Sequence, residues 1–472
     1  MSWEPVIGLE MHVQLKTRTK MFCRCESGYG AAENKRTCPV CLAHPGALPV
    51  PNARAIEWTI KLGLALGCEI APRSTFHRKN YFYPDNPKGY QISQYDEPLC
   101  VGGSLDLPGS GGAARIGITR AHLEEDAAKN VHVGGAEGRI TGSSSTLVDF
   151  NRGGTPLVEI VSEPDLRSAE DAKRFLQLLR QTVVELGISD AEMEKGSLRF
   201  DVNVSVRPAG SGELRTRTEL KNMNSFAFAA RGIEQEVRRQ IEIYESGGQI
   251  EQETLHFDPA HESAPPLRSK EEAQDYRYFP EPDLVPVEPP PELVERLRAE
   301  LPERPSVRLA RLQERYGLSA YDAEVLNASP ALVALFEGAV AAGAEAKPAA
   351  NVLANQFAAA GIDPATVDPG ELGKLIRART KIPRSVFDEA LAATGEPSFS
   401  AERYLGEAAI SSSAELEPVV DRVLAANESQ VLAFRAGKEG LLGFFVGQVM
   451  RETSGKANAR IVSELVRRKL AE

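Results

Sequence analysis

The stretch Val6-Ile7-Gly8-Leu9-Glu10-Met11-His12-Val13-Gln14-Leu15-Lys16 alternates apolar and polar residues. Successive side chains of a β-strand point to opposite faces of the sheet, so this alternation is typical of a strand that is buried on one side. The apolar face takes the odd-numbered residues, and the other face takes Glu10, His12, Gln14 and Lys16. We therefore expect a sheet with one face on a core and one polar face.

Two further segments repeat this pattern. Residues 198–207 place apolar side chains at even positions and align Arg199, Asp201 and Asn203 on the other face, and residues 216–222 alternate in the same way. Between the first strand and these segments, Ser168-Ala169-Glu170-Asp171 predicts the capped start of a helix that ends at Gly187. The N-terminal region therefore mixes strands with a few helices.

Composition sets the outline of the chain. At 472 residues it exceeds one ordinary core, and a content of 42% apolar and 26% charged residues supports burial of large cores. Prolines crowd residues 279–292, which predicts a linker, and alanine- and leucine-rich sequence at helical spacing follows, with Ser413 as a candidate helix cap in the last part. We expect an α+β fold: a mixed-sheet domain over 1–290, an all-α domain over 291–400 and a small all-α tail domain over 401–472.

Charge and hydropathy limit the environment of the chain. The net charge of −11 argues against bulk attraction to nucleic acid, so any RNA contact has to be a local patch. No apolar stretch reaches the length of a membrane helix, and we expect a cytoplasmic protein without a membrane partner.

Four of the six cysteines form two close pairs. Cys23-Arg24-Cys25 is followed after twelve residues by Cys38-Pro39-Val40-Cys41. Four thiolates in this arrangement can surround a zinc ion tetrahedrally and close its shell, which predicts a structural metal site. The alternative is a set of ordinary buried cysteines.

Carboxylates and a histidine form the second candidate site. Glu10 and His12 share one strand face, Glu124-Glu125-Asp126 ends the segment Arg120-Ala121-His122-Leu123-Glu124-Glu125-Asp126, and Glu159 interrupts the apolar strand Pro156-Leu157-Val158-Glu159-Ile160-Val161. A buried lone carboxylate is costly unless it is paired or bound to a cation such as magnesium. Each of these acids could instead be an ion-pair partner, because spacing alone does not bring them together.

The third signal is residues 76–95, which interleave cations, amides and aromatic residues in a turn-rich loop. This composition suits phosphates and a stacked base, although a surface loop with its own aromatic core would look similar. Residues 221–226 and 275–280 have the same character. Neither a Walker-type loop nor a Gly-x-Gly-x-x-Gly motif is present, so any ATP site has to be of another design. A Gly-x-Ser-x-Gly elbow typical of amide hydrolysis is also missing, so a source of ammonia, if the reaction needs one, lies elsewhere.

The end of the chain is locally basic. Residues 431–472 contain eight Lys and Arg residues and four Glu residues, and the difference leaves +4 in an acidic protein. This excess fits either an RNA-binding patch or solvated helix faces. The loop Thr453-Ser454-Gly455-Lys456-Ala457-Asn458 is the candidate contact point.

Residues 6–15, 78–94, 151–165 and 275–282 resemble the family of B subunits of the bacterial glutamyl/aspartyl-tRNA amidotransferase, and the resemblance runs from end to end. It implies a cradle-shaped catalytic domain that holds metal, ATP and the 3′ end of aminoacyl-tRNA, then a helical domain and a tRNA-binding tail. It also implies a heterotrimer with an amidase subunit and a small third subunit; an aminoacyl-tRNA synthetase could be a further partner. Met11 and Ala43 depart from the family pattern, where we expect valine and glycine.

The site residues follow from these motifs. The resemblance places Glu10, His12, Glu125 and Glu159 in the magnesium-binding, catalytic region, and Cys23, Cys25, Cys38 and Cys41 in the zinc knuckle of some members. For ATP and the tRNA end we expect the following residues: Lys79, Tyr81, Lys88, Ser93, Arg199, Asp201, Asn203, Lys221 and Arg277.

The reaction that the resemblance implies has two steps. The side-chain carboxylate of misacylated Glu-tRNA(Gln), or of Asp-tRNA(Asn), attacks the γ-phosphorus of ATP, and ammonia then displaces phosphate to leave the amide. Two other interpretations remain: a non-catalytic zinc-containing tRNA adaptor, and a metal-dependent phosphohydrolase that acts alone. The basic tail fits poorly with the second.

Overall fold

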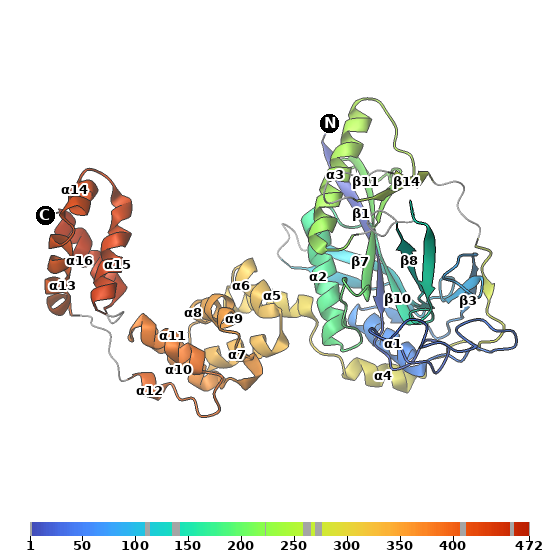
Figure 1. The fold of residues 1–472 in the computed structure, drawn as a ribbon, viewed down its shortest axis with the longest axis horizontal. Coiled ribbons are helices and arrows are strands. Elements are labelled where there is room, and N and C mark those ends of the chain that lie inside the picture. The colour runs from blue at the N-terminus through green and yellow to red at the C-terminus, as the bar shows by residue number, and fades with distance from the viewer. Residues whose placement is uncertain are drawn as a thin grey trace. The chain divides into compact units, whose positions relative to one another are not determined.

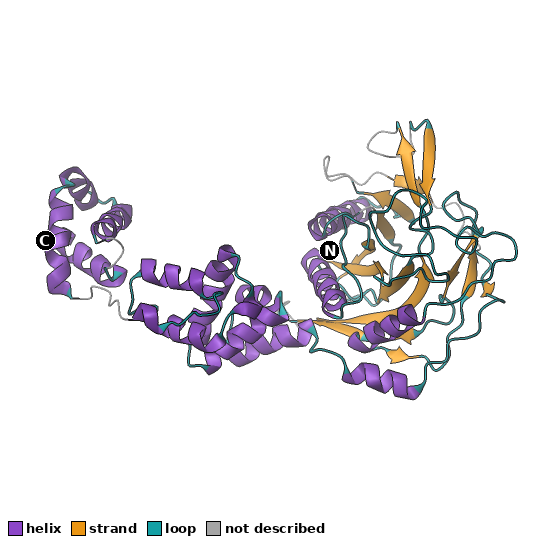
Figure 2. Ribbon diagram, turned by 60° about the horizontal axis from the view of Figure 1, so that its bottom comes forward, coloured by secondary structure: helices purple, strands orange, loops and turns teal. Residues whose placement is uncertain are grey.

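The computed structural model describes residues 2–108, 114–134, 142–221, 223–257, 266–269, 276–405, 412–453 and 457–471. The chain divides into two compact units, residues 1–307 and 308–472. Strands are confined to the first unit and the second is helical throughout its described part, which confirms the expected α+β class (Figure 2). The domain limits at 290 and 400 stay a prediction.

A large mixed sheet organises the first unit (Figure 1). Its pairings are antiparallel except for the parallel pair β12–β13. Its main path runs in the order β14 (Pro266–Ser269), β13 (Glu253–His256), β12 (Thr218–Lys221), β11 (Leu198–Pro208), β1 (Trp3–Gln14), β10 (Pro156–Ser162), β7 (Ala114–Glu125), β4 (Tyr90–Ser93), β3 (His77–Asn80) and β15 (Phe279–Pro280).

Shorter strands complete the unit. The strands β2 (Glu69–Ile70), β5 (Cys100–Val101) and β6 (Ser104–Leu107) join the sheet at its β7 side. A separate two-stranded sheet pairs β8 (Lys129–Val133) with β9 (Ser145–Asp149). The helices are α1 (Ala53–Ala65), α2 (Ala169–Glu185), α3 (Phe226–Glu245) and α4 (Pro291–Ala299).

The core lies between the sheet and the adjacent helices α2 and α3. The odd-numbered residues of β1 from Ile7 to Val13 and the even-numbered residues of β11 from Leu198 to Val206 are buried, as their alternation predicts. Met11 lies opposite Phe200 in the register of the two strands, and the Phe200 ring stacks on Phe226 of α3 at 5.9 Å. The polar residues of β1 and β11 therefore occupy the other face of the sheet.

The helix α2 begins where the sequence predicts. The Ser168 hydroxyl accepts a hydrogen bond from the Asp171 backbone N–H, and Gly187 has φ +71°, the left-handed conformation that favours glycine after a helix end. This helix packs against α3. The two caps thus set the length of the element that covers the core beneath the polar face.

The second unit is a series of helices. They are α5 (Pro305–Tyr316, which begins in the first unit), α6 (Ala320–Asn327), α7 (Pro330–Ala341), α8 (Ala346–Asn351), a π-helix (Val352–Phe357), α9 (Ala358–Ala360), a 3-10 turn (Pro364–Thr366), α10 (Pro369–Ala378), α11 (Arg384–Ala393), α12 (Glu402–Leu405), α13 (Ser413–Ala425), α14 (Glu428–Arg435), a 3-10 turn (Glu439–Leu441), α15 (Leu442–Glu452) and α16 (Ala459–Ala471).

The last helices share one core, which includes Leu416, Phe445 and Val462. The cap of α13 is Ser412, whose hydroxyl accepts from the Glu415 N–H, and not Ser413, which is already the first residue of the helix. A neighbouring serine satisfies the same capping rule, so the sequence alone misplaced the cap by one residue.

Among the described residues, no single helix is long and apolar enough to cross a membrane. The pair α6 and α7 reaches the required length and composition only together, with a bend of 118° between them.

Candidate functional site

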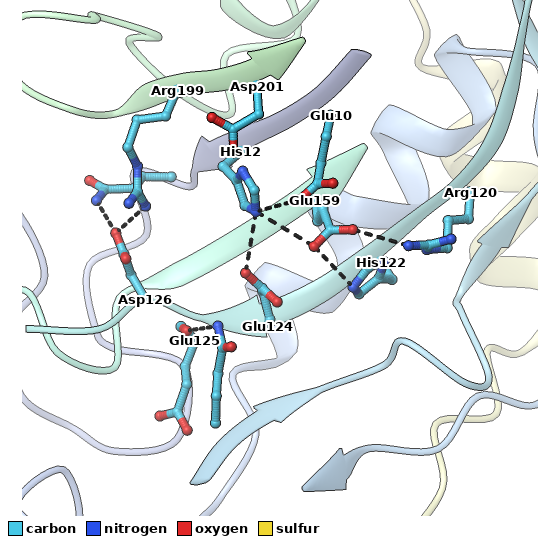
Figure 3. A network of polar contacts seen from close by, with 12 residues as sticks. Glu10, His12, Arg120, His122, Glu124, Glu125, Asp126, Glu159, Arg199 and Asp201 are labelled. Carbon is cyan, nitrogen blue, oxygen red and sulfur yellow. Dashed lines mark hydrogen bonds and ion pairs between the residues drawn. The ribbon is translucent and has the colours of Figure 1, made fainter. Parts of the chain in front are cut away.

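Four adjacent strands align polar side chains in one row across the sheet (Figure 3). In register, Arg199 of β11 lies opposite His12 of β1, His12 lies opposite Glu159 of β10, and Glu159 lies opposite His122 of β7. Side chains at directly opposed positions on one face are close enough to interact. The register therefore brings together residues that are up to 187 positions apart, as in the pair His12 and Arg199.

His12 is the centre of an acidic cluster. Its Nε2 atom lies 3.5 Å from Glu159 Oε2, 3.8 Å from Glu10 Oε1 and 3.8 Å from Glu124 Oε1. Glu124 and Glu159 are nearly buried, and the His12 side chain is 19% exposed. Three carboxylates around one imidazole, with little water, create a strong demand for positive charge.

The pKa values of the cluster reflect this demand. Burial alone would lower the pKa of His12, but the contact with Glu159 and the charges of Glu124 and Glu10 outweigh it and raise the pKa to about 9. Burial and the neighbouring Glu159 raise the pKa of Glu124 to about 7. The pKa of Glu159 falls, because His12, His122 and Arg120 favour its charged form over the opposing effect of burial. In the absence of a bound cation, a proton on His12 supplies the positive charge.

The cluster offers donors for a cation. One atom from each of Glu10, His12 and Glu159 lies within 4.8 Å of the others, and so does one atom from each of His122, Glu124 and Glu159. Carboxylate oxygens are the preferred ligands of Mg²⁺, and imidazole together with carboxylate also suits Mn²⁺. The donor set thus fits a divalent cation in type and in spacing.

The structure brings Glu10, His12 and Glu159 together, but it places Glu124 rather than Glu125 against His12. Glu125 points away from the cluster (Figure 3), forms a close ion pair with Lys88, and accepts a hydrogen bond from the Ile92 N–H at 3.1 Å. The alternation in residues 120–125 contained the signal, because apolar Ala121 and Leu123 leave the even-numbered residues on the polar face. A cation role for Glu125 stays a prediction.

A groove of about 770 Å³ begins at the acidic cluster, with Glu10 and Glu159 in its lining. Its wall contains Tyr95 and Tyr278, whose rings stack at 5.1 Å with an interplanar angle of 16°. The Arg120 guanidinium lies 4.5 Å from the centre of the Tyr95 ring. Stacked aromatic rings beside a cation form a surface that suits nucleobases and phosphates.

Several residues expected to bind ATP or the tRNA end line this groove or lie next to it. Lys79 lines it with Nζ 4.9 Å from the centre of the Tyr276 ring, and Asn203 lines it from β11. Asp201 lies opposite Glu10 in register and pairs with Lys221 at 2.6 Å. Arg277 lies in the sequence between Tyr276 and Tyr278, which both line the groove, and its backbone has φ +44°.

The other expected residues do not line the groove. Arg199 pairs with Asp126 at 2.7 Å, and Ser93 is buried opposite Glu124 in register. Tyr81 and Lys88 line a smaller hollow together with Glu125, and burial raises the pKa of Tyr81. Tyr95 and Glu124 lie in stretches that the sequence singled out, but neither they nor Arg120 and His122 were predicted as site residues, because only the register of distant strands brings them to the site.

The four cysteines Cys23, Cys25, Cys38 and Cys41 converge, with their sulfurs within 4.8 Å of one another. A tetrahedral zinc ion with Zn–S bonds of about 2.3 Å separates its sulfurs by about 3.8 Å, and Cys38 and Cys41 already lie at 3.9 Å. The hydrogen bond from Cys23 lowers the pKa of the Cys41 thiol to about 4. The quartet is therefore compatible with zinc.

Lys20 and Ala43 lie next to the cysteine cluster. The Lys20 side chain is buried, with Nζ 3.7 Å from Cys41 Sγ and 3.0 Å from the Phe150 carbonyl oxygen, so it places a positive charge beside the thiols. Ala43, at the position where we expected glycine, has φ +58° in the turn that follows Cys41. A cavity of about 240 Å³ separates this cluster from Lys88 and Glu125.

Comparison with known proteins agrees with the arrangement of the chain. Residues 5–295 match the GatB/GatE catalytic domain, and residues 334–470 match the GatB domain. Proteins named as the B subunit of aspartyl/glutamyl-tRNA(Asn/Gln) amidotransferase are similar over their full length: that of Geobacter sulfurreducens is 50% identical and that of Geotalea daltonii 51%, each with 100% of both chains covered. The protein from an Anaeromyxobacter species is 49% identical, with 99% of both chains covered. The chain belongs to the family of aspartyl/glutamyl-tRNA amidotransferase B subunits.

Proposed function

We propose that this chain carries out the ATP-dependent step of a tRNA-dependent amidotransferase, a ligase that acts on glutamate attached to tRNA(Gln) or aspartate attached to tRNA(Asn). The substrate class rests on the names of the relatives. The observation that carries the step itself is the acidic cluster around His12 at one end of a groove lined with tyrosines and cations. Phosphoryl transfer depends mainly on positioning and on charge neutralisation, and this arrangement provides both.

Glu10, His12 and Glu159 would hold a magnesium ion, which neutralises charge on the phosphates of ATP when bound. An oxygen of the substrate side-chain carboxylate attacks the γ-phosphorus, and the bond from that phosphorus to the β–γ bridging oxygen breaks. The products are an acyl phosphate and ADP. Ammonia then attacks the acyl carbon, phosphate leaves with the bonding electron pair, and loss of a proton leaves the amide.

The groove would hold the two substrates. Lys79 and Arg120 offer positive charge to phosphates, and the stacked pair Tyr95 and Tyr278 offers a surface for a base. Lys88 and Arg199 do not line the groove, and each is paired with a carboxylate outside it. We assign them to shaping the site rather than to direct contact with γ-phosphate.

Ammonia would come from a partner amidase subunit, with a small third subunit to complete a heterotrimer. This assignment rests on the resemblance and on the lack of an amide-hydrolysing serine motif in the sequence. The cysteine quartet would hold a structural zinc ion, since four thiolates leave no open position for substrate.

The tail, residues 401–472, would contact tRNA. Lys438, Arg451 and Arg467 are exposed, and none of the three has an ion-pair partner among the described residues. Such cations remain available for an RNA backbone. Of the candidate loop 453–458, residues 454–456 lie outside the described part of the chain.

Chemical trapping tests the proposed step. The chain, assembled with its partner subunits, is incubated with glutamyl-tRNA(Gln), ATP and hydroxylamine. Hydroxylamine displaces phosphate from an acyl phosphate and leaves a side-chain hydroxamate, which is separated from the α-hydroxamate that forms at the aminoacyl ester without ATP. Glu159→Gln should lower hydroxamate formation by about 100-fold or more, since it removes a charge at the reacting phosphates. The matched control is Glu170→Gln, whose side chain is 65% exposed on α2. Formation of the side-chain hydroxamate that does not require ATP, or that Glu159→Gln leaves intact, would contradict the proposal.

A further inference from the structure

The donors of the acidic cluster form two overlapping triads and not one shell. Glu10, His12 and Glu159 make one triad, and His122, Glu124 and Glu159 make the other. Within each triad the ligand atoms lie within 4.8 Å of one another, and Glu159 is the member that the two triads share. A cation held by one triad alone would leave the two other donors of the second triad without an ion.

His122 provides an independent indication of a ligand. Its side chain is fully buried, and neither ring nitrogen has a hydrogen-bond partner among the described residues. Its Nε2 atom faces the cluster at 3.9 Å from Glu159 Oε2, too far for a hydrogen bond (Figure 3). Buried polar atoms are rarely left without a partner, so this imidazole is a donor directed at a position that a ligand would fill.

Glu159 has the geometry of a bridge. Its Oε2 atom lies between two imidazoles, 3.5 Å from His12 Nε2 and 3.9 Å from His122 Nε2. Its Oε1 atom accepts a hydrogen bond from the Arg120 guanidinium at 3.2 Å, which fixes the orientation of the carboxylate. One oxygen therefore faces both triads, as a carboxylate does when it bridges two metal ions about 3.5–4 Å apart.

We propose that the cluster binds a pair of divalent cations, with the second held by His122, Glu124 and Glu159 and bridged to the first through Glu159. This inference rests on the proposed function for the first position, held by Glu10, His12 and Glu159. Each triad combines one imidazole with two carboxylates, so the pair accepts Mn²⁺ more readily than Mg²⁺, which favours an all-oxygen shell.

A second cation changes what the site can do. In two-metal sites one ion stabilises the attacking oxygen and the other the leaving oxygen of an in-line displacement. Here the first position borders the groove through Glu10, whereas Glu124 and His122 lie deeper and are buried. The deeper ion would hold the substrate carboxylate or the γ-phosphate against the floor of the sheet.

Manganese binding tests the pair directly. The zinc-loaded chain, assembled with its partner subunits, is titrated with Mn²⁺ and followed by electron paramagnetic resonance. The expected result is about two Mn²⁺ per chain, with the six-line signal of isolated Mn²⁺ replaced by an exchange-coupled spectrum as the second ion binds. His122→Phe keeps an aromatic ring against Tyr95 but removes both nitrogens, and it should reduce binding to one uncoupled Mn²⁺.

Two further variants secure the interpretation. Glu124→Gln changes the same triad without altering its shape and should also leave one uncoupled ion, which covers the case in which His122→Phe does not fold. His132→Phe, on β8 outside the cluster, should keep two coupled ions. One uncoupled Mn²⁺ in the unmodified protein, or two coupled ions in His122→Phe, would overturn the pair and leave the proposed function standing. No Mn²⁺ bound at the cluster would overturn both.

Discussion

The charge state of His12 predicts how cation binding depends on pH. In the cation-free protein the pKa of His12 is raised to about 9, because the surrounding carboxylates outweigh the effect of burial. A raised pKa means that the proton stabilises the fold below pH 6.5 and that this contribution is lost as the pH rises through about 9. A cation that takes Nε2 as a ligand has to displace that proton. Its apparent affinity therefore increases with pH.

The size of the effect follows from the pKa values. Between pH 7.5 and pH 8.5 Glu124 has already lost its proton, with its pKa at about 7, and His12 is the group that still holds one. The affinity of the position that His12 helps to form should rise about tenfold over this unit of pH, with about one proton released when Mn²⁺ binds there. Below pH 7 the affinity for Mn²⁺ should change more steeply with pH, because Glu124 then binds a proton as well.

Isothermal titration calorimetry in buffers of different ionisation enthalpy measures both the affinity and the proton release. His12→Gln should bind Mn²⁺ more weakly and lose the slope between pH 7.5 and pH 8.5. His132→Gln should retain this dependence of affinity on pH, because the His132 ring contacts Thr146 and lies outside the cluster. Constant affinity across this pH range in the unmodified protein, without proton release, would refute the reasoning.

Three substitutions test other parts of the structure. Arg78→Ala leaves the buried Glu281 carboxylate without its two 2.7 Å hydrogen bonds and should cost about 3 kcal/mol of unfolding free energy in urea denaturation; a loss below about 1 kcal/mol would contradict the ion-pair role. Lys20→Met removes the cation beside Cys41, and zinc affinity in competition with a chelator should fall about 10- to 100-fold, whereas an unchanged affinity would exclude Lys20 as a support of the site. Ala43→Gly relieves a left-handed residue at φ +58° and should raise stability by up to about 1 kcal/mol; a lower thermal midpoint would show that the turn is not strained.

The part of the fold that follows local rules could be predicted from the sequence. Alternation located the buried face of β1 and β11, and the capping serine and terminal glycine located α2, because each depends on neighbours within a few residues. The cysteine spacing likewise predicted a cluster that the structure contains. These features need no knowledge of how distant segments meet.

The composition of the site could not be predicted in the same way. The alternation of residues 120–125 indicates that Glu124 is on the polar face, but its position against His12 depends on the register of β7 against β10. The stacking of Tyr95 on Tyr278 joins the segment after β4 to the segment before β15, which are neighbours at one end of the sheet but lie 183 positions apart in the sequence. His122 has no distinguishing neighbour in sequence; its importance appears only from its burial and from its unpaired nitrogens within the described part of the chain.

The most direct test of the central claim is ATP cleavage by this chain assembled with its amidase partner and the small third subunit, in the presence of magnesium, with and without glutamyl-tRNA(Gln). The proposed role predicts ADP release that depends on the misacylated tRNA and that Glu159→Gln abolishes. Equal cleavage with and without the tRNA would indicate a phosphohydrolase that acts alone. Binding of the tRNA without any cleavage of ATP would make the chain an adaptor and contradict the claim.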